Sequence, residues 1–124
     1  MIEAIKAEHT KIKARYHAGH DLYDQIVQAL GNFNEWWGHG YQVAPYKYEY
    51  RCMPLASAYS MRPITNRPPV LITVIFNARH EVWLEIWENN KQTNTLVTSF
   101  DEATQRIAPV VAVDLFARGM YNWK

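Results

Sequence analysis

The residues best suited to chemistry near the amino end are two histidines and an aspartate. His17, His20 and Asp24 are three and four residues apart, which would place two imidazoles and a carboxylate on one face of a helix. Such a set can bind zinc or another transition metal. No fourth ligand is evident, so we interpret the histidines as solvated or capping groups and expect no metal site.

A second set consists of two glutamates that alternate with two tryptophans. Glu81 and Glu85 would share one face of a strand with Trp83 and Trp87. Residues four apart on a strand are separated by about 13 Å, beyond the roughly 5–9.5 Å between the paired carboxylates of glycosidases. Aromatic anchors flanked by charges are typical of protein interfaces. We therefore predict that these four residues bind a partner, and we predict no catalytic residue.

The middle of the chain is rich in cations and tyrosines. These side chains could contact phosphates and stack on bases, as in single-strand binders: Tyr46, Lys47, Tyr48, Tyr50, Arg51, Arg62 and Arg67. The whole chain carries a formal charge of only +1, so any such contact would depend on this local patch. Binding of nucleic acid by the 46–67 region is therefore the alternative prediction.

Several classes of function lack their usual signals. No glycine occurs between Gly40 and Gly119, so a glycine-rich phosphate loop is excluded there, and we expect no cofactor. Cys52 is the only cysteine and cannot form an internal disulfide, and the first residues lack the apolar core of a signal peptide. These features favour a reducing cytoplasm. No run approaches the roughly 18 apolar residues of a membrane span, so we expect no membrane partner.

The hydrophobic pattern predicts an α+β fold in one domain, residues 1–124. Apolar residues at spacings of four and three predict helical structure over 2–37. Gly19 is a poor helix former and favours two helices over one. A single helix of about 35 residues would also be about 50 Å long, which exceeds the width of so small a domain. Alternation predicts strands over 46–51, 70–76 and 80–88, with another near 95–97.

The remaining segments are an irregular loop and a second helical region. Four prolines predict a long irregular loop over 53–69. Ser99 and Glu102 have the spacing of a capping box, and Pro109 should kink or restart the C-terminal helix that follows. We expect an antiparallel sheet of four or five strands, with an N-terminal helix or helix pair and a C-terminal helix.

The predicted strand over 80–88 suggests the function. Its aliphatic side should face the core, while the side with Trp83 and Trp87 is either partly open or covered by the N-terminal helix. We predict that the protein is a non-catalytic protein-binding module. We expect it to bind a protein partner and to form a homodimer. Small aromatic-rich chains, including proteins carried by phages and mobile elements, are often regulators or inhibitors of a larger assembly. We expect such a role here.

The third prediction is a small enzyme or a ligand-binding cone. The order of helices and then sheet resembles that of NTF2-like proteins, in which a cone-shaped sheet encloses a ligand pocket. The resemblance implies that a histidine or an acidic residue would act as the base, and a deep pocket that contains His39 or His80 next to a carboxylate would support this prediction.

Overall fold

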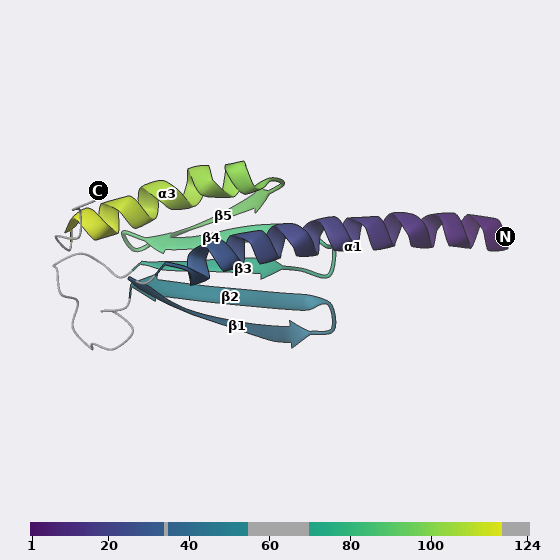
Figure 1. Ribbon diagram of the computed structural model, residues 1–124, viewed down its shortest axis with the longest axis horizontal. Helices are drawn as coiled ribbons and strands as arrows, with labels where there is room; N and C mark the ends of the chain where they lie inside the picture. The colour runs from purple at the N-terminus through teal and green to yellow at the C-terminus, as the bar shows by residue number, and fades with distance from the viewer. Residues whose placement is uncertain (34, 55–69, 118–124) are drawn as a thin grey trace.

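The computed structural model describes residues 1–33, 35–54 and 70–117 (Figure 1). Within these ranges the chain forms α1 (Ile2–Gly31), β1 (Trp36–Ala44), β2 (Lys47–Pro54), β3 (Leu71–Phe76), β4 (Val82–Glu88), β5 (Lys91–Val97) and α3 (Phe100–Ala117). The strands form one antiparallel sheet in the order β1-β2-β3-β4-β5. The predicted α+β class is confirmed. Nearly all of the predicted loop over 53–69 lies outside the described residues, since β2 ends at Pro54.

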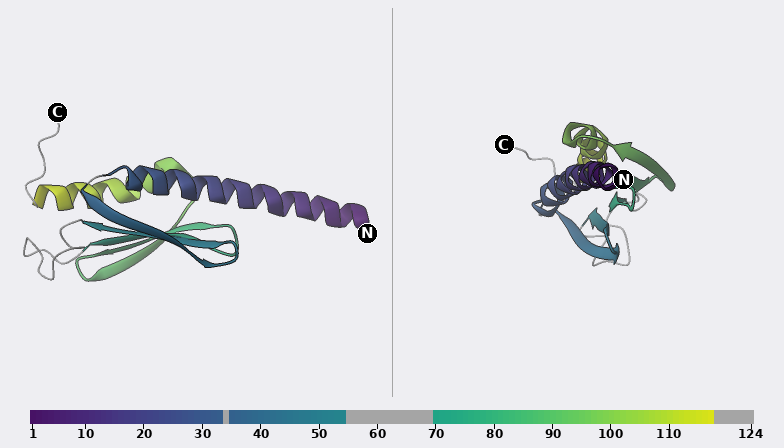
Figure 2. Two further views of the ribbon diagram at one scale, coloured as in Figure 1. Left: turned by 60° about the horizontal axis from the view of Figure 1, so that its bottom comes forward. Right: turned by 90° about the vertical axis from the view of Figure 1, so that its right-hand side faces the viewer.

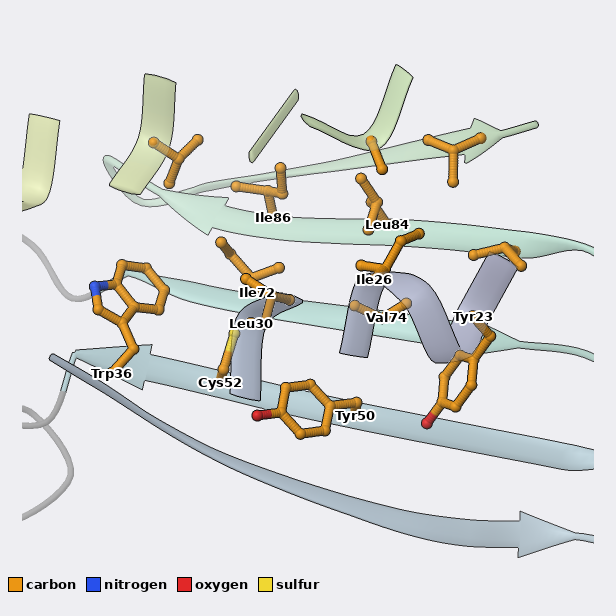
Figure 3. Close-up of a cluster of buried hydrophobic side chains, with 14 of the residues drawn as sticks. Tyr23, Ile26, Leu30, Trp36, Tyr50, Cys52, Ile72, Val74, Leu84 and Ile86 are labelled. Carbon is orange, nitrogen blue, oxygen red and sulfur yellow. The ribbon is translucent and has the colours of Figure 1, made fainter. Parts of the chain in front are cut away.

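Both helices lie on the same side of the sheet (Figure 2). Alternate residues of the strands face them, and the core forms between Ile26 and Leu30 of α1 and residues such as Ile72, Val74 and Leu84 (Figure 3). Ile72, Val74 and Leu84 are fully buried. The described residues therefore form a two-layer structure, in which neither α1 nor α3 covers the other face of the sheet (Figure 2).

The N-terminal helix is continuous, so the predicted break at Gly19 is wrong. Gly19 lies where α1 crosses the β3–β4 turn, and a Cβ atom there would collide with the backbone oxygen of His80 and come within 2.8 Å of Cε1 of Phe76. The glycine therefore permits close packing of the helix on the turn. The length argument failed because the amino-terminal half of α1 extends beyond the sheet (Figures 1 and 2).

The helix ends earlier than predicted, and a strand follows it. α1 stops at Gly31, and Trp37 belongs to β1 rather than to a helical stripe. Trp37, His39 and Tyr41 alternate with Gly38 and Gly40, a period of two that indicates a strand. The spacing of four residues between Phe33 and Trp37 fitted a helix by coincidence.

Local sequence determines the turn of the β4–β5 hairpin and the start of α3. Asn89 and Asn90 both have positive φ, at 52° and 61°, as expected for the two central residues of a tight hairpin turn. The capping box is confirmed: the backbone N–H of Glu102 donates to Oγ of Ser99 at 3.1 Å. α3 runs through Pro109 without restarting.

Candidate functional site

The face of the sheet opposite the helices is unusually aromatic for a surface. The strands place these residues in three rows, which we call the uncovered face: Tyr41, Glu49, Ile75, Trp83 and Leu96; His39, Arg51, Thr73, Glu85 and Asn94; Trp37, Met53, Leu71, Trp87 and Gln92. Neighbours within a row are paired across adjacent strands, except Met53 and Leu71, which lie directly beyond the last β2–β3 pair, Cys52 and Ile72. An antiparallel sheet with one solvated face normally has polar residues there. Here aromatic and aliphatic side chains occupy most of the two outer rows.

The predicted partner-binding residues lie together on this face. Trp87 is 37% exposed, and Trp83 is partly buried. Glu81 precedes β4 and accepts hydrogen bonds from Nδ2 of Asn77 at 3.0 Å and from the indole Nε1 of Trp83 at 3.4 Å. These hydrogen bonds, first that of Asn77, hold the pKa of Glu81 below its usual value. Glu81 thus helps orient the ring of Trp83, and Glu85 lies between the two tryptophans along the strand.

A ladder of three rings on β1 enlarges the face. The ring of His39 stacks between those of Trp37 and Tyr41, with centroid distances of 6.1 and 5.9 Å. The guanidinium of Arg51 lies 5.8 Å from the centre of the Tyr41 ring. The hydroxyl of Tyr41 donates to Glu49 at 2.6 Å, and this hydrogen bond raises its pKa.

Sequence reasoning missed this ladder. Its signal was the alternation of aromatic residues with glycines after Trp36.

The charges on the uncovered face are few and mixed. Arg51 pairs with Glu49 at 3.6 Å, and Glu85 adds a second carboxylate. Counting one cation and two acids among the three rows gives a net charge of −1 with histidine neutral. The face therefore offers aromatic contact area without a positive potential.

The described residues of the predicted nucleic-acid patch lie on different sides of the sheet. Tyr50 is buried, 7% exposed, and Tyr48 is partly buried, both on the side that the helices cover. Tyr46 is exposed in the β1–β2 turn, beside the exposed Lys47. Arg51 lies on the opposite face from Tyr50, because successive strand residues point to opposite sides. Arg62 and Arg67 lie outside the described residues. Tyr46, Tyr48 and Tyr50 therefore do not form an exposed row on which bases could stack.

The histidines that the sequence offers for metal binding or catalysis lie in two places. His17, His20 and His80 are near the contact between α1 and the β3–β4 turn, and His39 is on β1. Nδ1 of His20 lies 3.3 Å from Oδ2 of Asp24, while His17 packs edge-on against Tyr16. Within the described ranges, no group of three histidine, cysteine or acidic residues is arranged to hold a metal ion. His80 contacts the rings of Tyr16 and Phe76.

A groove of about 410 Å³ separates the C-terminal half of α1 from α3. Its lining includes Ile26, Leu30, Ile107 and Val111, and none of the lining residues can titrate. The groove can accept an apolar group, but it contains neither His39 nor His80 and offers no acid or base. It therefore lacks the feature that the NTF2-like prediction requires.

The projecting half of α1 is a second unpartnered surface. Ile2, Ile5 and Ile12 are 67%, 60% and 44% exposed, and they continue the helical stripe that packs on the sheet further along. Lys6 and Lys13 flank this stripe. Lys6 lies 3.9 Å from Glu3 and Lys11 lies 3.4 Å from Glu8, so charges of both signs lie on this half of the helix.

Comparisons with known proteins add no family: no family model, curated protein or solved structure matches this chain. No helix in the described part of the chain is long and apolar enough to span a membrane.

Proposed function

We propose that this protein is a non-catalytic protein-binding module that holds its partner on the uncovered face. The observation that carries the proposal is the position of Trp83, Trp87 and Trp37 on the side of the sheet away from both helices. Trp87 and Trp37 are 37% and 40% exposed. Tryptophan and tyrosine are enriched at the energetic centres of interfaces, and a contiguous exposed aromatic patch usually marks an interaction site.

The charge of the face favours a protein over a nucleic acid. Nucleic-acid binding depends on several cations that neutralise phosphates, whereas the three rows contain only Arg51, already paired with Glu49. Mixed charges around aromatic anchors supply selectivity for a protein partner. Nucleic-acid binding thus has no specific observation in its favour among the described residues.

The finer expectations concern the role and the setting. We expect the protein to regulate or inhibit a larger assembly, to work in the cytoplasm and to form a homodimer. A binding face, combined with a groove that has no acid or base, supports a role in binding rather than in catalysis. The buried thiol of Cys52, 1% exposed, suits a reducing compartment.

The test is affinity capture from the native host with tagged wild type, Trp83→Ser and Trp87→Ser, singly and together. Removing an interface hot spot costs about 2 kcal/mol or more, which is roughly a thirtyfold loss of affinity. We expect wild type to retain one protein, and the tryptophan variants to lose it. Retention should survive nuclease and respond little to salt.

The matched control is Phe116→Ser, an aromatic on α3 that is 70% exposed and lies in the helical layer. It should retain the same protein as wild type. Circular dichroism and urea unfolding verify that each variant folds. Equal retention by the folded double tryptophan variant, or loss of the captured protein on nuclease treatment, would contradict the proposal.

A further inference from the structure

The edge of the sheet at β1 has only one of the features that usually prevent pairing, an irregularity between Gln42 and Ala44 near its end. Among the described residues, no strand pairs with the outer edge of β1. Its nine residues, Trp36–Ala44, include no lysine, acid or proline. Natural sheets commonly block an exposed edge with such residues or with bulges. Within the described part of the chain, the outer edge of β1 therefore has no strand to accept or donate its backbone hydrogen bonds.

The regular part of β1 has a defined centre. Its register with β2 is uninterrupted from Trp36 to Gln42, and the irregularity comes only between Gln42 and Ala44. The midpoint of this stretch is His39. A two-fold axis through His39 would set Trp37 opposite Tyr41 of the second copy, Tyr41 opposite its Trp37, and the two His39 rings beside each other.

We propose that two copies of this chain pair through their β1 strands, antiparallel and centred on His39, to form one continuous sheet of ten strands. Successive residues alternate in face, so the pairing joins the two uncovered faces on one side. Cross-strand aromatic pairs are favourable in antiparallel sheets. The inference gives a geometry to the homodimer expected above, and it is independent of partner binding, because the edge pairs through its backbone whether or not the uncovered face binds another protein.

A second copy fits this edge better than an unrelated strand for two reasons. First, the symmetric register pairs every ring of the ladder with a ring of the second copy. Second, Gly38 of one copy would lie opposite Gly40 of the other, and neither has a side chain that could clash. The nearest cation to the axis is Arg51 on β2. Two copies of it would be about 14 Å apart, three strand spacings, beyond the screening length of about 8 Å at physiological salt.

Disulfide cross-linking tests the register directly. In the proposed dimer the two copies of position 39 face each other with Cα atoms about 4.5–5.5 Å apart, within the range for a disulfide. His39→Cys should therefore form a covalent dimer under mild oxidation. Position 43 lies four residues from the axis, so its two copies are about 26 Å apart.

Val43→Cys is thus the matched control: Val43 is on the same strand and 53% exposed, yet its variant should stay monomeric on a denaturing gel. The native Cys52 does not interfere, because it is buried and burial raises the pKa of its thiol to about 12. Equal cross-linking by the two variants, or none by His39→Cys, would overturn the register.

Sedimentation equilibrium tests the association itself. His39→Lys places two like charges side by side and removes a ring, so it should weaken the dimer at least roughly tenfold. His39→Phe keeps the ring and should preserve the dimer. Position 39 is exposed, and circular dichroism verifies that both variants fold. A wild-type protein that stays monomeric up to millimolar concentration would refute the proposal, as would a dimer that His39→Lys leaves intact.

Discussion

Replacing Gly19 with alanine should destabilise the protein although alanine is the better helix former. The added Cβ would collide with the backbone oxygen of His80 and lie 2.8 Å from Cε1 of Phe76. Phe76 is completely buried and cannot turn aside, so the helix or the β3–β4 turn must move.

The magnitude follows from two opposing effects. Alanine gains about 1 kcal/mol of helix propensity over glycine, while overpacking a tight contact costs about 1–3 kcal/mol. Because one of the colliding atoms is backbone, we expect the cost at the upper end. The net loss of unfolding free energy should be about 2 kcal/mol.

Gly31→Ala is the control. Gly31 is the last residue of α1, and a Cβ there meets only the hydroxyl of Tyr50, at an ordinary 3.8 Å. This variant should gain about 0.5 kcal/mol. Urea unfolding, with an m-value of about 1–3 kcal/mol/M, should separate the midpoints of the two variants by about 1 M or more. If Gly19→Ala is as stable as Gly31→Ala, α1 does not pack on the turn as described.

Three further predictions concern other parts of the fold. Ser99→Ala removes the acceptor of the Glu102 backbone N–H and should lower the free energy of unfolding by about 0.5–2 kcal/mol in urea; no change would contradict the capping box. Asn77→Ala should raise the pKa of Glu81 in an NMR titration, since the Asn77 amide is the main cause of its lowered pKa. Because that pKa is lowered on folding, Glu81 stabilises the native state above the pKa of the unfolded chain, and this contribution fades as pH falls through the folded pKa. Backbone amides of α1 before Arg15 should exchange faster than those near Ile26, because a helical segment of this length is marginal without packing; equal protection would show that a partner covers it.

Strict alternation predicted the faces of β4 correctly, because apolar residues at every second position leave only one arrangement of the strand. The same signal in β2 showed that Tyr48 and Tyr50 share a side, but not that this side faces the helices. That depends on Ile72 and Val74 of the neighbouring strand, which lie far away in the sequence. A single strand cannot reveal which of its mixed faces is buried.

The errors at Gly19 and β1 have the same physical origin. A glycine within a helical pattern can mark a break or a close contact, and only the approach of His80 decides between them. The ladder on β1 was hidden because Phe33 and Trp37 extend a helical spacing by coincidence. Long-range packing determines both features, and the local sequence does not encode it unambiguously.

Hydroxyl-radical footprinting of the tryptophans compares the two faces of β1 within one strand. Trp36 is 6% exposed and Trp37 is 40% exposed, although they are neighbours in the chain. We expect radicals to oxidise Trp37 and Trp87 in the free protein, to leave Trp36 unmodified, and to lose access to Trp37 and Trp87 once the captured partner is bound. If Trp37 and Trp87 of the free protein are oxidised as slowly as Trp36, these rings are not exposed and the account is wrong. If their oxidation is the same in the complex as in the free protein, the partner does not bind to the uncovered face.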